Sequence, residues 1–186
     1  MKRIFVFIIL VFLACAHQQP TLLQTYSSPD YLIWSETRKL TWDDFKGTPI
    51  ENSSLVTEIV IQNPSLIEQQ NLISSPKFEA ICFVNRNTSW AIKERVTDNL
   101  LKYNQTIFDI YELYTRKLKQ SFAYAELNAF NSSEKYKILT EANYAELISK
   151  LKNFRSESKM GSEENIVDKW ATKINSELEK LKIYKN

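Results

Sequence analysis

The order of periodic patterns along the chain predicts an α+β fold. Strand-like alternation of apolar residues is confined to the first half, in residues 55–62 and 77–85. Three long stretches with helical spacing follow in the second half. Strands that precede helices, instead of alternating with them, are typical of α+β proteins. We therefore expect a small antiparallel sheet followed by three long helices.

The first residues have the pattern of an export signal. Lys2 and Arg3 provide a positive start, and residues 4–13 form an apolar run of about ten residues, which is too short to span a bilayer. Two processing routes stay open. The sequence FLAC, which ends at Cys15, resembles a bacterial lipobox, whereas ACA at 14–16 suits ordinary cleavage.

We expect residues 1–16 to be a signal peptide of the lipoprotein type, with lipidation at Cys15. The polar residues 17–32 would then be a tether, and residues 33–186 a single domain of ordinary size. The protein would be exported, and either periplasmic or held at the membrane only by its N-terminal lipid.

Charge and nucleophile content exclude several function classes. Without Lys2 and Arg3, 22 basic residues face 22 acidic ones, so nothing indicates nucleic acid as a partner. The single histidine, His17, lies in the expected tether, so a serine or cysteine nucleophile in the domain would have no histidine base. Cys82, in the apolar run FEAICFV, is expected to be a small buried residue.

The strands are expected on the following pattern. In 77–85 every second residue is apolar, and 55–62 alternates in part; the alternating positions are Val56, Ile59, Ile61, Phe78, Ala80, Cys82 and Val84. The intervening residues 63–76 have the composition of a loop or irregular connection.

The first helix is expected at about 98–125, with Thr97 or Asp98 as its N-cap. Its apolar positions step by three and four: Leu100, Tyr103, Ile107, Tyr111, Tyr114 and Leu118. The sequence NSSE at 131–134 resembles a capping box for a second helix that ends near Asn153. After a break at 159–162, a last helix is expected at 163–183.

The stretch IWSETRKLTWDDFKGTP, at 33–49, has an unusual composition. Asp43 and Asp44 could be paired carboxylates for acid–base chemistry. Adjacent carboxylates, however, point to different sides of most backbones. A helix N-terminus or turn after Thr41, with acidic residues that cap it or are solvated, is the favoured interpretation.

Three stretches carry a resemblance to a known family. They are residues 33–49, SWAIKERVTDNLLK at 89–102 and FDIYELYTRKL at 108–118. Together they resemble the bacterial family called domain of unknown function 922, described as predicted secreted zinc-dependent proteases, from Ile33 to about Leu181. The resemblance implies a zincin-like helix at 98–125 that bears H-E-x-x-H, and a third histidine before the last helix.

This chain departs from that pattern at every critical position. Two histidines four residues apart would bind zinc and the glutamate between them would activate water. Here Tyr103 and Ile107 stand at the two histidine positions, Asn104 at the glutamate position and Met160 at the third ligand position. The sequence therefore predicts no catalytic residue, no zinc and no other cofactor.

The leading hypothesis is a non-catalytic, pseudoprotease-like envelope protein that binds an unknown protein, peptide or envelope component. Its binding cleft would occupy the former active site, lined by Tyr103, Ile107, Tyr111, Tyr114 and Met160.

Two alternatives stay open. One is a metal-dependent hydrolase or peptidase with a site rebuilt from the carboxylates of Asp109, Glu112 and Glu157. The other is a structural lipoprotein with a collapsed cleft, in which Tyr103 and Ile107 would be buried with no pocket beside them.

Overall fold

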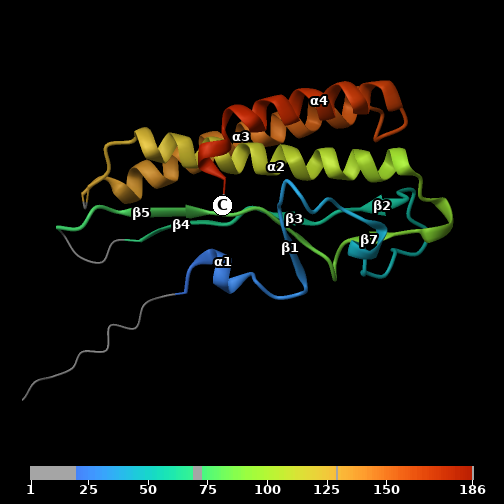
Figure 1. The fold of residues 1–186 in the computed structure, drawn as a ribbon, viewed down its shortest axis with the longest axis horizontal. Helices are drawn as coiled ribbons and strands as arrows, with labels where there is room; N and C mark the ends of the chain where they lie inside the picture. The colour runs from blue at the N-terminus through green and yellow to red at the C-terminus, as the bar shows by residue number, and fades with distance from the viewer. Residues whose placement is uncertain (1–19, 69–72, 129, 186) are drawn as a thin grey trace, which may run out of the picture.

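The computed structural model describes residues 20–68, 73–128 and 130–185, and it confirms the α+β fold. The expected signal peptide, with Cys15 and His17, lies outside these residues. Figure 1 shows the strands as a thin middle layer, with the small helix α1 on one side and the long helices on the other. Those helices are α2 (Asp98–Tyr124), α3 (Ser132–Glu157) and α4 (Glu164–Lys180).

The strands form three small antiparallel groups. The central one has the order β1-β6-β3, with β1 Tyr31–Ile33, β6 Phe83–Asn85 and β3 Ile61–Gln62. The others are the pairs of β2 (Thr57–Glu58) with β7 (Trp90–Ala91), and of β4 (Ser65–Glu68) with β5 (Lys77–Ala80).

The expectation of two continuous strands with a loop between them was wrong in detail. Each expected strand is split in two, and β4 lies within the stretch 63–76 that the sequence marked as irregular. Pro64 stands between β3 and β4 and has no N–H to donate, which interrupts the ladder. Its carbonyl still accepts a hydrogen bond from the N–H of Ile81, at 3.1 Å, so the two strand groups stay connected.

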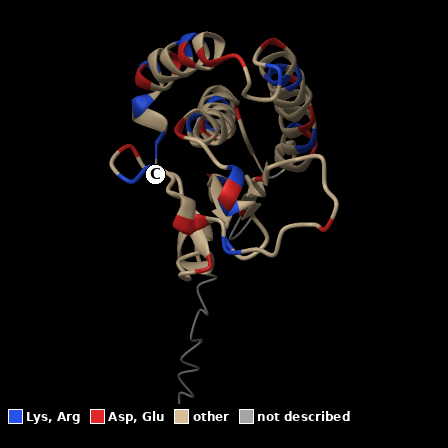
Figure 2. Cartoon of the chain, turned by 90° about the vertical axis from the view of Figure 1, so that its right-hand side faces the viewer, with Lys and Arg blue, Asp and Glu red and all other residues tan. Residues whose placement is uncertain are grey.

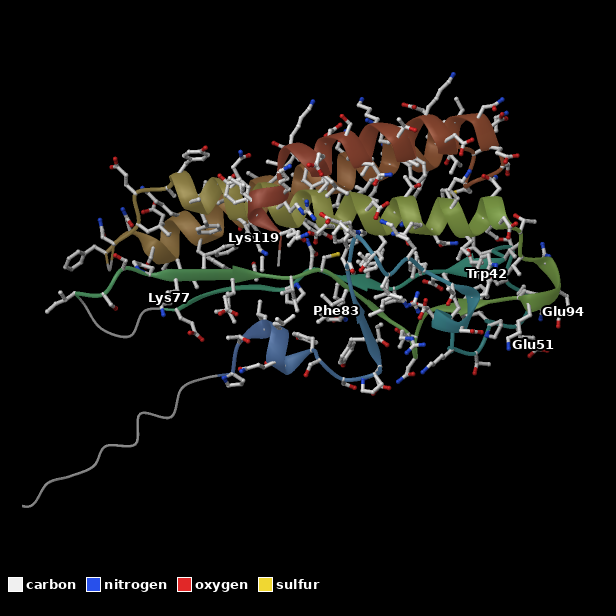
Figure 3. The ribbon with its side chains drawn as sticks, in the orientation of Figure 1. Trp42, Glu51, Lys77, Phe83, Glu94 and Lys119 are labelled. Carbon is white, nitrogen blue, oxygen red and sulfur yellow. The ribbon has the colours of Figure 1, made fainter. Side chains whose placement is uncertain are left out.

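The folded part begins earlier than the sequence indicated. Residues 17–32 were expected to be a tether. In the structure α1 (Leu22–Thr25) lies within this stretch, and β1 begins at its end. Leu22 is buried and its N–H donates to Glu79 Oε2 at 2.9 Å. The rings of Tyr26 and Tyr31 pack on Phe83, with centroids 4.3 and 4.9 Å away. Figure 3 shows Phe83 on the α1 side of the strands, so burial of these apolar groups holds the segment down.

The helix boundaries follow local capping chemistry. Thr97 is the N-cap of α2, and its side chain accepts a hydrogen bond from the N–H of Leu100, as expected. The capping box expected before α3 was wrong, because the Asn131 side chain is used within the preceding loop. It accepts from the N–H of Asn128 and donates to the carbonyl of Glu126. The last helix ends at Lys180 and is followed by η3 (Lys182–Tyr184).

Helix α2 is the centre of the main core. In Figure 2, which views α2 from its end, α3 and α4 lie beside it, and acidic and basic residues are interspersed along both helices. Its buried side chains meet apolar residues of the other two helices: Leu147, Leu151, Phe154, Val167, Ile174 and Leu178. Cys82, from the strand layer, is fully buried in the same cluster, as expected. None of the helices in the described residues is long and apolar enough to cross a membrane.

We predict that Gly47→Ala destabilises the fold. The Gly47 N–H donates to the Ser89 carbonyl at 2.8 Å. A Cβ at this position would stand 2.9 Å from that carbonyl oxygen and 3.0 Å from the oxygen of Asn87. Both are backbone atoms that cannot move away freely, so the free energy of unfolding should fall by about 1–3 kcal/mol in urea denaturation.

Thr48→Ala, at the exposed neighbouring position, is the matched control and should leave the unfolding midpoint nearly unchanged. Equal stability of Gly47→Ala and this control would contradict the close approach.

Candidate functional site

The residues at the expected ligand positions lie in the first half of α2. Tyr103 and Ile107 are one helical turn apart and face the core, with 4% and 3% of their surfaces exposed. The ring of Tyr103 stacks on that of Phe154 from α3, with centroids 5.1 Å apart. Burial raises the pKa of Tyr103, although Arg155 opposes the shift. The metal-binding phenolate form is therefore disfavoured here.

The turn after α3 brings Met160 to the same place. Lys159 and Met160 have φ angles of 47° and 57°, a left-handed conformation that reverses the chain direction. The Tyr103 hydroxyl donates to Met160 Sδ at 3.6 Å. The position identified as the third ligand is thus in direct contact with the position of the first.

Gly161 completes the enclosure of the Tyr103 ring. A Cβ at this residue would stand 2.8 Å from Tyr103 Cγ, so only glycine allows the turn to pass so close. Its φ of 91° also favours glycine. Asn99 in the first turn of α2 donates to the Gly161 carbonyl at 2.6 Å and holds the turn against the helix.

Asn104, at the position of the catalytic glutamate, is buried and acts as a structural donor. Its Nδ2 donates to Thr57 Oγ1 at 3.1 Å and to the Leu100 carbonyl at 2.8 Å. The first bond ties α2 to β2. An amide with these partners has no basic atom to activate water.

The cleft expected from the sequence is packed core in the structure. Tyr114 is buried and Tyr111 half-buried against the main cluster, together with Tyr103 and Ile107, while Met160 is half-exposed on the turn. Four hollows in the described residues are lined by side chains other than these five. The large apolar and aromatic side chains fill the space that a cleft would need.

The alternative carboxylates have separate partners. Asp109 Oδ1 accepts from Trp34 Nε1 at 2.7 Å and from Gln105 Nε2 at 2.8 Å. Glu112 pairs with Arg116 at 2.8 Å, and Glu157 accepts from Trp170 Nε1 at 2.7 Å.

The rebuilt carboxylate site is thus not assembled. Within residues 20–68, 73–128 and 130–185, no group of three or more His, Cys, Asp or Glu side chains is placed to hold a metal ion.

Burial controls the chemistry of the two carboxyl groups inside α2. It raises the pKa of Asp109, against the opposing charge of Lys39, whose Nζ is 3.9 Å away. It also raises the pKa of Glu112, against the hydrogen bond from Arg116. Burial is again the main reason that the pKa of the Cys82 thiol is raised well above its ordinary value, so Cys82 is a poor nucleophile.

Asp109 lines a hollow of about 470 Å³ between α2 and α4. Lys102 and Asp168 form an ion pair across it, at 2.6 Å. Gln105, Thr106, Thr172 and Asn175 supply hydrogen-bonding groups to its walls. The hollow offers polar contacts, and its second carboxylate is already paired with a lysine.

Sequence reasoning missed the structural role of the stretch 33–49. Arg116 is fully buried; it stacks over Trp34 at 4.8 Å, pairs with Glu36 at 3.5 Å and donates to the Leu178 carbonyl at 2.9 Å. The tryptophan and charged residues of this stretch indicated a special role. Their partners could not be identified from the sequence, because they stand more than sixty residues away in the chain.

The Asp43–Asp44 pair has a structural explanation. Asp44 is fully buried and accepts from the N–H of Thr41 at 2.8 Å, at the start of η1 (Trp42–Asp44). Arg38 and Arg86 pair with it at 2.8 and 3.1 Å. The capping interpretation was therefore right for Asp44, and Asp43 is exposed.

Comparisons with family models, with curated proteins and with solved structures give no match.

We predict that Tyr103→Ala lowers the free energy of unfolding by about 3–5 kcal/mol, because it leaves a cavity beside Phe154 in a closed part of the core. Tyr103→Phe keeps the ring and loses only the contacts of the hydroxyl with Met160 Sδ and Arg155, so it should cost about 1 kcal/mol. Urea denaturation of both variants measures the difference. An alanine variant as stable as the phenylalanine variant would mean that the ring is not a packing element.

A second prediction concerns pH. The pKa of Asp109 is raised above 3.8 in the folded protein, so the folded state holds this proton more tightly than the unfolded chain. Its contribution to the free energy of unfolding therefore falls as pH rises from 3.8 through the folded-state pKa. Asp109→Asn removes the titration and keeps an oxygen for Trp34 and Gln105.

The stability of Asp109→Asn relative to the wild type should thus increase between about pH 4 and pH 7 in urea denaturation. The negative charge of Asp109 also raises the pKa of Glu112, so the substitution lowers that pKa and changes the difference in the same direction. Asp43→Asn, at the exposed neighbour of Asp44, is the control. A pH-independent difference for Asp109→Asn would contradict the assignment.

Proposed function

We propose that this chain is an exported, non-catalytic relative of the domain of unknown function 922 family, in which the active-site position has become part of the core. It would be a structural envelope lipoprotein with a collapsed cleft, anchored through Cys15. The observation that carries the proposal is the enclosure of Tyr103 by Phe154, Met160 and Gly161.

The contact between Tyr103 and Met160 supports the relationship to the family. The resemblance assigns these two positions to ligands of one metal, although they are 57 residues apart. Their side chains touch in the fold. A shared location in the fold is what two ligands of one metal would require.

The burial of the same residues supports the loss of the cleft. Binding through a former active site requires an open surface, and Tyr103 and Ile107 are packed against α3 and the core. The hydrolase alternative requires Asp109, Glu112 and Glu157 to act together, and each has its own partner. The collapsed-cleft alternative therefore accounts for more of the observations than the cleft-binding hypothesis does.

Metal binding tests both parts of the proposal. The purified wild-type protein should contain no stoichiometric zinc by elemental analysis, because no donor set stands at the ligand positions. The variant Tyr103→His/Asn104→Glu/Ile107→His/Met160→His should gain binding of about one zinc or cobalt ion, since the family geometry would supply three nitrogen donors.

The matched control carries the first three substitutions and keeps Met160, and it should bind more weakly. Circular dichroism checks that each variant is folded. Stoichiometric zinc in the wild type would overturn the non-catalytic assignment. A folded quadruple variant that binds no better than the control would overturn the family relationship.

A further inference from the structure

A groove of about 620 Å³ runs along the outer side of β5. It is bounded by α1, by the C-terminal end of α2 and by η3, and Figure 1 shows these elements beside one another near the C-terminus. The lining residues that matter here are Thr21, Leu23, Phe78, Phe122, Ile183 and Tyr184. We call the surface formed by these six residues the β5 face.

The rims of the β5 face are apolar and open. Leu23 is 49% exposed and Ile183 is 79% exposed, although both are large aliphatic residues. Tyr184 lies beside Ile183, and the hydroxyl groups of Tyr184 and Tyr124 are hydrogen-bonded to each other. Tyr124 is also exposed. Exposed aliphatic residues next to tyrosines have the composition of a surface at the boundary of headgroups and acyl chains.

Two lysines near the β5 face are paired with carboxylates, and Lys119 and Glu79, of opposite charge, also line the groove. Lys185 pairs with Glu36 at 2.9 Å, and Lys182 pairs with Glu179 at 2.7 Å. Glu79 accepts the N–H of Leu22. Contact made by this surface would therefore depend on its apolar residues and only weakly on salt.

The length of chain before the fold restricts what this surface can meet. Helix α1 starts at Leu22, with Thr21 as its N-cap. Only residues 16–20 separate Thr21 from Cys15. Six Cα–Cα steps span at most about 20 Å. Helix α2, with 27 residues, is about 40 Å long, so the tether reaches only half the length of the molecule. An acylated Cys15 would hold the side of the protein that carries Thr21 close to the bilayer.

We propose that the β5 face lies against the phospholipid bilayer, with Leu23 and Ile183 inserted at the boundary between headgroups and acyl chains. The inference rests on the lipid anchor of the proposed function and adds a second, non-covalent membrane contact to it. The fold itself is then oriented on the membrane, with α3 on the side away from the lipid.

The test uses the full chain, purified in detergent and reconstituted into vesicles of phosphatidylethanolamine and phosphatidylglycerol. Leu23→Cys and Ile183→Cys are labelled singly with an environment-sensitive fluorophore; Cys82 is fully buried and does not compete. The control is Ile148→Cys on α3, an aliphatic position that is 42% exposed.

The probes at 23 and 183 should show blue-shifted emission and quenching by nitroxide-labelled lipids, at low and high salt alike. The probe at 148 should show neither. Circular dichroism checks that the labelled proteins are folded. Probes at 23 and 183 that are no more quenched than the control would overturn the inference. So would a blue shift that depends on protein concentration in detergent, because it would assign the β5 face to contact between copies.

The mass of the purified protein separates this inference from its premise. Acylated Cys15 with unquenched probes at 23 and 183 would overturn the membrane contact and leave the proposed function standing. A mass without acyl chains would overturn both the lipid anchor and the inference. In that case the Cys15→Ser variant should be found in the membrane fraction to the same extent as the wild type.

Discussion

The buried guanidinium of Arg116 is the interaction on which the arrangement of this protein depends. It lies on α2 and contacts three other parts of the chain: Glu112 one turn earlier, the Leu178 carbonyl near the end of α4, and the N-terminal stretch through Trp34 and Glu36. A buried charge without its partners would be costly, because its desolvation would not be compensated. This side chain therefore links the central helix to the last helix and to the segment that follows β1.

This constraint explains the unusual composition of the stretch 33–49. Trp34 and Glu36 contact Arg116, Trp34 also donates to Asp109, and Arg38 and Asp44 stabilise the start of η1. These contacts hold the stretch 33–49 against the second half of α2 and against η1. The first half of α2 is fixed by different contacts. There, a stacked ring, a sulfur contact and an asparagine bonded to β2 link the helix to its neighbours.

The helices could be predicted from the sequence more accurately than the strands and the N-terminal segment. The apolar stripe from Leu100 to Leu118 indicated a long amphipathic helix, and the helix has the expected N-cap at Thr97. Such local signals are strong because every residue reports the same period. Each strand has only two to four residues, so its periodic signal is weak. Whether Pro64 interrupts a strand depends on whether a neighbouring strand would have accepted a hydrogen bond at that position, which the sequence does not show. The segment at 22–33 seemed a polar tether because its apolar residues are spaced irregularly, and only contact with Phe83 and Glu79 makes it part of the fold.

The sequence by itself determined the α+β class, the three long helices and the burial of Cys82, since residue identity and periodicity are local properties. The tertiary structure alone decided whether the positions that the resemblance assigned to metal ligands line a cleft. Tyr103 and Met160 are far apart along the chain, and whether two such side chains leave a gap or close it depends on the turn at 159–161 and on the glycine that lets it pass. The answer is a closed core, because Phe154 and the turn supply the contacts that an open cleft would have left to a ligand.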